Sequence, residues 1–177
     1  MPLKSAIEAW DGKSVEALCR IHDQHRDDPD LAATLVELIG ALRYRLAATR
    51  LLKRHLESGG SVPDADSVAR GLYARFDKLE NWECRLNVLQ CLPYLPMPDD
   101  AVEAVECFLR LCLADDNKFV RASAYNGFHC LAGQHPRFAD EVAAILEAGL
   151  RDEPPSVKAR IRKCLAGAAP GRRPYGR

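Results

Sequence analysis

Apolar residues recur along the chain three and four positions apart, which is the spacing of amphipathic helices, and no stretch alternates as a strand would. Four segments align with one another without gaps. Each carries apolar or aromatic residues at positions i, i+4, i+7 and i+8 and a basic residue at i+1, so one side of each helix is apolar. These segments are residues 44–52, 84–92, 120–128 and 157–165. We therefore predict four equivalent helices and no sheet.

A further helix is predicted before each of these four. The basic residues at i+1 are 36 to 40 residues apart, which is the period of helical-hairpin repeats. Pro29, Pro136 and Pro155 suit the first turns of helices, whereas Gly59 and Gly133 suit helix ends. The additional helices are expected at residues 31–39, 68–76, 102–113 and 142–150.

This arrangement predicts an all-α protein, a right-handed α-α superhelix (solenoid) of about five helical hairpins in one domain over residues 1–167. Residues 1–28 would form a divergent hairpin that caps the N-terminal end. Residues 168–177 have no periodicity and are rich in Pro, Gly and Arg, which predicts a basic disordered tail. The four repeats are expected at about residues 30–58, 64–96, 98–133 and 136–167.

An acidic turn precedes the second helix of a pair, and that helix begins with a Val-Arg-x-x-Ala-like pattern. The clearest copy spans Asp115 to Ala124, and the copy from Asp152 to Lys158 is close. Over about residues 30–167 this pattern resembles the HEAT repeat of the armadillo/HEAT superfamily. The resemblance implies a stack with a concave surface for a partner. Similar stacks serve as transport and phosphatase scaffolds and as alkylpurine DNA glycosylases, but no residue here matches a motif specific to one of these activities.

A basic residue stands beside the apolar stripe in every copy. It either faces a ligand or pairs with a turn acid, such as Asp115 or Asp152, of its own or the adjacent repeat. The second interpretation is favoured, because a residue next to a buried stripe is well placed to hold successive hairpins in register. The residues of this predicted structural ladder are Arg45, Arg85, Arg121 and Lys158.

A polar residue occupies position i+6 in every copy, far from the apolar stripe at 100° per residue. Stacked helices would place these residues in one row on the concave surface, where solenoids hold partners. Exposed helix positions are polar in any case, so the pattern alone does not distinguish binding from simple solvation. The candidate partner-binding residues are Arg50, Gln90, Asn126 and Lys163, with Tyr125 and Arg162 beside them at i+5.

The 25 basic and 25 acidic residues cancel, but their distribution is uneven. No acidic residue follows Glu153, and a second basic cluster surrounds Arg50. These clusters, around Arg50 and Lys163, would suit a polyanion such as nucleic acid, or they are solvated helix faces. The basic residues are Arg43, Arg45, Arg50, Lys53 and Arg54 in one cluster and Lys158, Arg160, Arg162, Lys163, Arg172, Arg173 and Arg177 in the other.

Other features of the sequence indicate where the protein works. No run of about eighteen apolar residues occurs, and the first residues have no apolar signal segment, so neither membrane insertion nor secretion is expected. The seven cysteines include no CxxC pair and mostly fall at core-facing positions. Reduced thiols in a cytoplasmic protein are the expectation.

Few residues suggest chemistry. His22 and His25 lie three apart with Asp23 between them, which is too little to define a metal site. Trp82 and Phe119 stand at turns and are either exposed anchors for a partner or, as is more usual, side chains that pack the turn onto the next repeat. No catalytic constellation, metal site or cofactor motif is found.

These observations predict a non-enzymatic scaffold or adaptor that binds a protein on its concave face. The alternative is a nucleic-acid-binding module, similar to HEAT-like DNA-repair proteins, that uses the basic clusters around Arg50 and Lys163. The sequence leaves the partner and the oligomeric state open.

Overall fold

The computed structural model describes residues 1–167, which form helices and turns without a strand, as the all-α prediction requires. The predicted tail at residues 168–177 lies outside the described residues. The α-helices are α1 (Leu3–Glu8), α2 (Val15–His25), α3 (Leu31–Ile39), α4 (Leu42–Glu57), α5 (Ala65–Tyr73), α6 (Trp82–Cys91), α7 (Val102–Leu113), α8 (Lys118–Gln134), α9 (Ala139–Asp152) and α10 (Pro155–Leu165). Short 3-10 helices are η1 (Phe76–Lys78), η2 (Leu92–Tyr94), η3 (Asp99–Ala101) and η4 (Pro136–Phe138).

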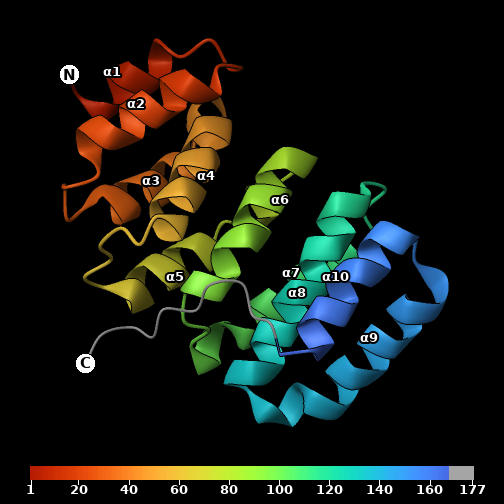
Figure 1. Ribbon diagram of the computed structural model, residues 1–177. Helices are drawn as coiled ribbons and strands as arrows, with labels where there is room; N and C mark the ends of the chain where they lie inside the picture. Colours follow the sequence, from red (N-terminus) through yellow and green to blue (C-terminus); the bar gives the residue numbers. More distant parts are fainter. Residues whose placement is uncertain (168–177) are drawn as a thin grey trace.

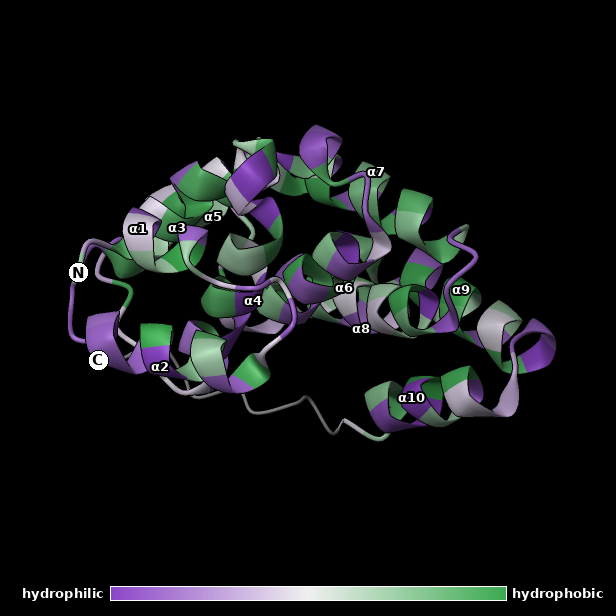
Figure 2. Cartoon of the chain, turned by 90° about the horizontal axis from the view of Figure 1, so that it is seen from above, coloured by the Kyte–Doolittle hydropathy of each residue, from purple (hydrophilic) through white to green (hydrophobic). Residues whose placement is uncertain are grey.

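The helices form two layers. The even-numbered helices pack side by side in the order α2, α4, α6, α8, α10, and most odd-numbered helices lie against them on one side. Figure 2 shows α3, α5, α7 and α9 along one side of α4, α6 and α8, while α2 and α10 project from the two ends on the other side. The face of α4, α6 and α8 that points away from α3, α5 and α7, together with the neighbouring face of α10, is called the inner side below.

One continuous aliphatic core joins the two layers, because each helix turns its apolar stripe toward the other layer. Aromatic side chains contribute at a few points. The Phe76 ring stacks on the Phe108 ring with centroids 4.0 Å apart, which ties η1 to α7. The core runs without interruption from Ala6 in α1 to Ile161 in α10.

Some helix boundaries follow from local chemistry. The side chains of Ser14, Asp64, Asn81 and Asn117 accept backbone N–H bonds at the starts of α2, α5, α6 and α8. Gly59 ends α4 with a φ of +75°, which other residues rarely adopt. The end predicted at Gly133 is wrong, since α8 continues to Gln134, and Pro136 begins a 3-10 helix rather than an α-helix.

The seven cysteines are free thiols, and their exposure predicts their reactivity. Cys107 is exposed, and burial raises the pKa of Cys112 to about 12. We expect a thiol reagent near neutral pH to label Cys107 first and to reach Cys112 only after unfolding. Mass spectrometry of the labelled protein measures the order, and rapid labelling of Cys112 in the native protein would contradict this core. The remaining buried thiols, expected to behave like Cys112, are Cys84, Cys91 and Cys164.

Candidate partner-binding surface

The four basic residues of the predicted ladder all donate to carbonyl groups at or near the end of the preceding helix. Arg45 Nε donates to Ile39 O at 3.0 Å, and Arg85 Nε donates to Leu79 O at 2.7 Å. Such carbonyls have no partner within their own helix, so the side chain satisfies them and adds positive charge where the helix dipole favours it. The other two donors are Arg121, to Asp115 O at 2.8 Å, and Lys158, to Arg151 O at 2.9 Å.

Two of these arginines also reach the following helical pair. Arg85 pairs with the Asp115 carboxylate at 2.9 Å, as the ladder predicts. Arg121 pairs with Glu153, with Nε 2.9 Å from Oε1, so the predicted partner Asp152 is wrong by one residue. Through these ion pairs Arg85 and Arg121 each join one helical pair to the next.

Two residues of the predicted concave row are buried, and the prediction that they line an open surface is wrong. Tyr125 and Asn126 are each 7% exposed. Asn126 Oδ1 accepts from the Cys164 thiol at 3.6 Å, and the Tyr125 hydroxyl donates to Glu153 Oε1 at 3.3 Å. Burial raises the pKa of Tyr125 to about 12. The physical reason is that α6, α7, α9 and α10 surround α8, so positions i+5 and i+6 face neighbouring helices.

The other four residues of that row are half-buried or exposed, and they differ in their contacts. Arg50 pairs with Glu83 at 3.2 Å and lies over the Trp10 ring, with its guanidinium carbon 5.4 Å from the centroid. Gln90 is half-buried, and its Oε1 is buried without a hydrogen-bond partner among residues 1–167. Such an acceptor is costly unless a water or ligand donates to it. Arg162 and Lys163 are exposed on α10.

The position most directly opposite the buried stripe is i+2, about 200° from position i. In all four helices it holds an apolar residue: the one on α10 is exposed, and the other three are half-buried and pack against the core with part of their surface. We call Leu46, Leu86, Ala122 and Ala159 the inner row. Sequence reasoning missed it by looking for polar groups, although apolar residues at the outward position of every copy were the available signal. Two turns further along, position i+9 holds Lys53, Pro93, His129 and Ala166.

A small hollow of about 80 Å³ opens where α4, α6, α8 and α10 meet. Gln90 and Asn126 lie in its wall, together with the hydroxyl residue Ser123. Glu57 and Arg160 place opposite charges around it, and neither forms an ion pair within the described part of the chain. The hollow therefore offers hydrogen-bonding groups beside the apolar inner row.

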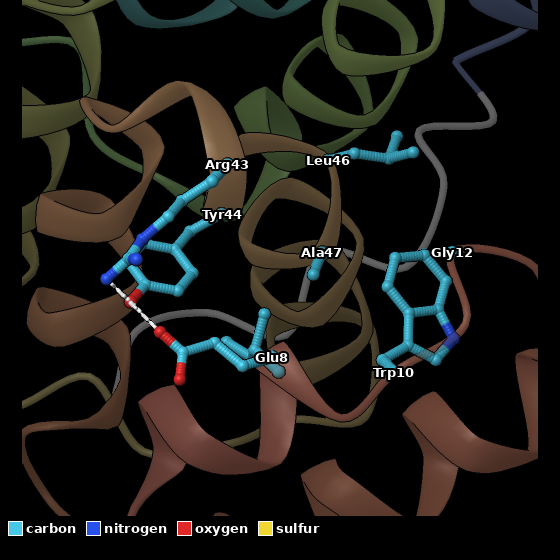
Figure 3. Close-up of a pocket in the computed structure, with 8 residues that line it drawn as sticks. Glu8, Trp10, Gly12, Arg43, Tyr44, Leu46 and Ala47 are labelled. Carbon is cyan, nitrogen blue, oxygen red and sulfur yellow. Dashed lines mark hydrogen bonds and ion pairs between the residues drawn. The ribbon is translucent and has the colours of Figure 1, made fainter.

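A larger cavity of about 340 Å³ lies between α1 and α4, where the inner row begins (Figure 3). Ile7, Trp10, Leu46 and Ala47 give it apolar walls. Figure 3 shows Glu8 joined to the Tyr44 hydroxyl and Arg43 on one side and the Trp10 ring on the other. The Trp10 Nε1 donates to Ser14 O at 2.8 Å, so its polar atom is satisfied and its ring adds apolar surface.

The aromatic residues predicted to pack turns onto the next repeat are exposed instead. Trp82 is 42% exposed in the first turn of α6, and Phe119 is 57% exposed in the first turn of α8. Leu42, at the start of α4, is 78% exposed. These three residues stand at the starts of α4, α6 and α8, which begin at the same edge of the molecule in Figure 1.

Comparisons of the chain with protein-family models, curated proteins and solved structures found no match. The HEAT resemblance therefore depends on the quoted repeat residues alone. Within residues 1–167, no group of three or more His, Cys, Asp or Glu side chains could hold a metal ion. No helix of the described chain is long and apolar enough to cross a membrane.

Proposed function

We propose that the protein is a non-enzymatic scaffold that binds a protein partner along the inner side of α4, α6, α8 and α10. The observation that carries this proposal is the inner row. Three of its side chains, Leu46, Leu86 and Ala122, are half-buried against the core, and the apolar surface that they leave exposed gains free energy by burial against a partner. Protein partners supply such surfaces, so the inner row favours a protein over a phosphate backbone.

The wider architecture in this proposal is a HEAT-like superhelix. Side-by-side packing of α4, α6, α8 and α10 supports it, as do the repeated carbonyl contacts of the ladder residues. In such a stack each pair contacts mainly its neighbours, and the inner helices present one long surface. The hollow beside Gln90 would then accept a hydrogen-bond donor from the bound partner, which would satisfy the unpaired Oε1.

Nucleic acid is the second candidate, and the basic clusters support it less than the sequence indicates. In the N-terminal cluster, Arg43 pairs with Glu8, Arg45 donates to backbone carbonyls and Arg50 pairs with Glu83. Two of these arginines are therefore paired with acids, and Arg45 is only 9% exposed, so less of this cluster's charge is available to a polyanion. The exposed bases of α10, Arg162 and Lys163, are the remaining feature that favours a polyanion.

The proposal is tested by capture of the partner with a Leu46→Asp/Leu86→Asp variant. Charges in the inner row would have to be desolvated on binding, so we expect recovery of the protein partner to fall at least about tenfold. The measurement is quantitative mass spectrometry of proteins captured by the wild type and the variant at low and high salt.

The matched control is Leu111→Asp, because Leu111 is an exposed leucine on α7 in the other layer. We expect this variant to retain the partner. If both variants retain every captured protein, the inner row is not the binding surface. If the captured species is nucleic acid and is released steeply by salt, the second candidate is correct.

A further inference from the structure

A chain of side chains connects α2 to the loop after α4. His22 Nδ1 lies 3.3 Å from Asp23 Oδ1, and His22 Nε2 lies 3.4 Å from His55 Nδ1. His55 Nε2 then lies 3.0 Å from Ser61 O. The ring centroids are 5.6 Å apart, so the two facing nitrogens lie almost on the line between them. The contacts thus run in series from a carboxylate through two imidazoles to a carbonyl.

Both ends of this series of contacts are hydrogen-bond acceptors, and this limits the number of protons that the two histidines carry. Its three contacts need three N–H protons, whereas two neutral imidazoles carry only two. Either one contact lacks a proton or the pair shares one additional proton. A second additional proton would place two cationic rings in direct contact, which burial makes very unfavourable. The docked pair therefore binds at most one extra proton, whereas two separate histidines bind one each.

Both rings are buried, with the loop after α4 packed closely against His55 and a cavity beside His22. His22 is 4% exposed and His55 is fully buried. A Cβ at Gly60 would lie 2.2 Å from the His55 ring, so the loop backbone fits directly against it. On the other side, a cavity of about 530 Å³ is lined by His22, Asp23 and Arg54.

The charged groups around the pair come from two helices and the segment after α2. Asp23 on α2 favours a proton on His22, and Arg54 on α4 opposes it. Arg26 and Asp27 line the same cavity from the end of α2. His25, also on α2, is half-buried, with its Nε2 unpartnered among the described residues. The loop supplies only the neutral carbonyl of Ser61.

We propose that the His22–His55 pair is a pH-sensitive latch that holds the α1–α2 hairpin on α4 and releases it in mild acid. The hairpin is a suitable element, because it packs against the rest of the protein chiefly through α4 at one end of the molecule (Figure 1). Its release would open the apolar cavity between α1 and α4 and remove Trp10 from its place beside Arg50.

The direction of the effect follows from linkage. Burial lowers the pKa of His22 below its ordinary value of 6.5, and the neighbouring His55 and Arg54 lower it further. A histidine whose pKa is lower when docked contributes stability that is complete above pH 6.5 and is lost as the pH falls toward the docked pKa. At pH 5 the docking equilibrium changes by at most about 30-fold, the limit in which His22 charges only on release.

The test is hydrogen exchange of the full chain at pH 7.5 and 5.0, corrected for the intrinsic pH dependence of exchange. We expect the protection of α2 amides to fall by up to about 30-fold at pH 5, while protection of α8 amides changes far less. A His22→Gln/His55→Gln variant should lose this pH dependence. His129→Gln, which alters a half-buried histidine on α8, should keep it.

Unchanged α2 protection at pH 5 in the wild type would overturn the proposal, as would equal loss of α2 and α8 protection. Retention of the pH dependence in the double variant would also overturn it. If the double variant fails to dock its hairpin at pH 7.5, the wild-type imidazole signals decide by NMR. The latch requires that His22 titrates with a pKa below its ordinary value of 6.5 while α2 is protected.

Discussion

Replacement of Arg121 by alanine is expected to lower the free energy of unfolding by about 2–4 kcal/mol, the range for breaking a largely buried ion pair that also carries backbone hydrogen bonds. The Arg121 side chain is 18% exposed and the Glu153 side chain 10% exposed. Its guanidinium donates to both carboxylate oxygens of Glu153 and to the carbonyls of Asp115 and Asp116. Its loss removes the cation that pairs with Glu153, which keeps its contact with the Tyr125 hydroxyl, and also removes the donor to two carbonyls that follow α7.

Urea denaturation followed by circular dichroism measures this loss, and Arg110→Ala is the matched control. Arg110 also pairs with two acids, Glu106 and Glu141, but at an exposed site where solvent screens the interaction. We expect the control to cost less than about 1 kcal/mol. Equal effects of the two substitutions would mean that the contacts of Arg121 do not join the helical pairs as described.

The second large effect is expected from Gly149→Ala in α9. A Cβ at this position would lie 2.6 Å from Ile161 Cδ1 and 2.7 Å from the Tyr125 ring. The ring cannot move away easily, because Tyr125 is buried and its hydroxyl bonds to Glu153. We expect a loss of about 1–3 kcal/mol, the usual cost of overpacking a core.

Gly133→Ala in α8 is the control for that substitution. Nothing lies within 4 Å of a Cβ built at Gly133, so alanine meets no obstacle there. Because alanine favours helix more than glycine, stability should rise by up to about 1 kcal/mol. Opposite signs at the two glycines, measured by denaturant unfolding, would establish close packing of α9 on α8 and α10. A gain at Gly149 would contradict that packing.

The repeat pattern predicted the helices because each repeat shows its apolar stripe at the same positions. It also favoured pairing of each ladder residue with a turn acid of its own or the adjacent repeat, and Arg85 pairs with Asp115 of the adjacent repeat. The sequence could not show whether Asp152 or Glu153 pairs with Arg121. The pairing depends on which of the two adjacent side chains the turn before Pro154 points toward Arg121.

The site was harder to predict, because the exposure of a helix position depends on how many neighbours that helix has. Position i+6 is exposed at Lys163, on the end helix α10, and buried at Asn126, on the central helix α8. The same position in the repeat is therefore exposed on one helix and buried on another. The contact between His22 and His55 joins residues 33 positions apart in different hairpins, which no local pattern indicates.

The inner row as a protein-binding surface is tested most directly by cross-linking from within it. A photoreactive amino acid at position 122, on the inner side of α8, would be compared with one at Leu111, on the outer layer. We expect a discrete protein adduct from position 122 and none of that mass from position 111, because only the first lies inside the proposed interface. Adducts of the same protein from both positions, or from position 111 alone, would contradict the assignment of the binding surface.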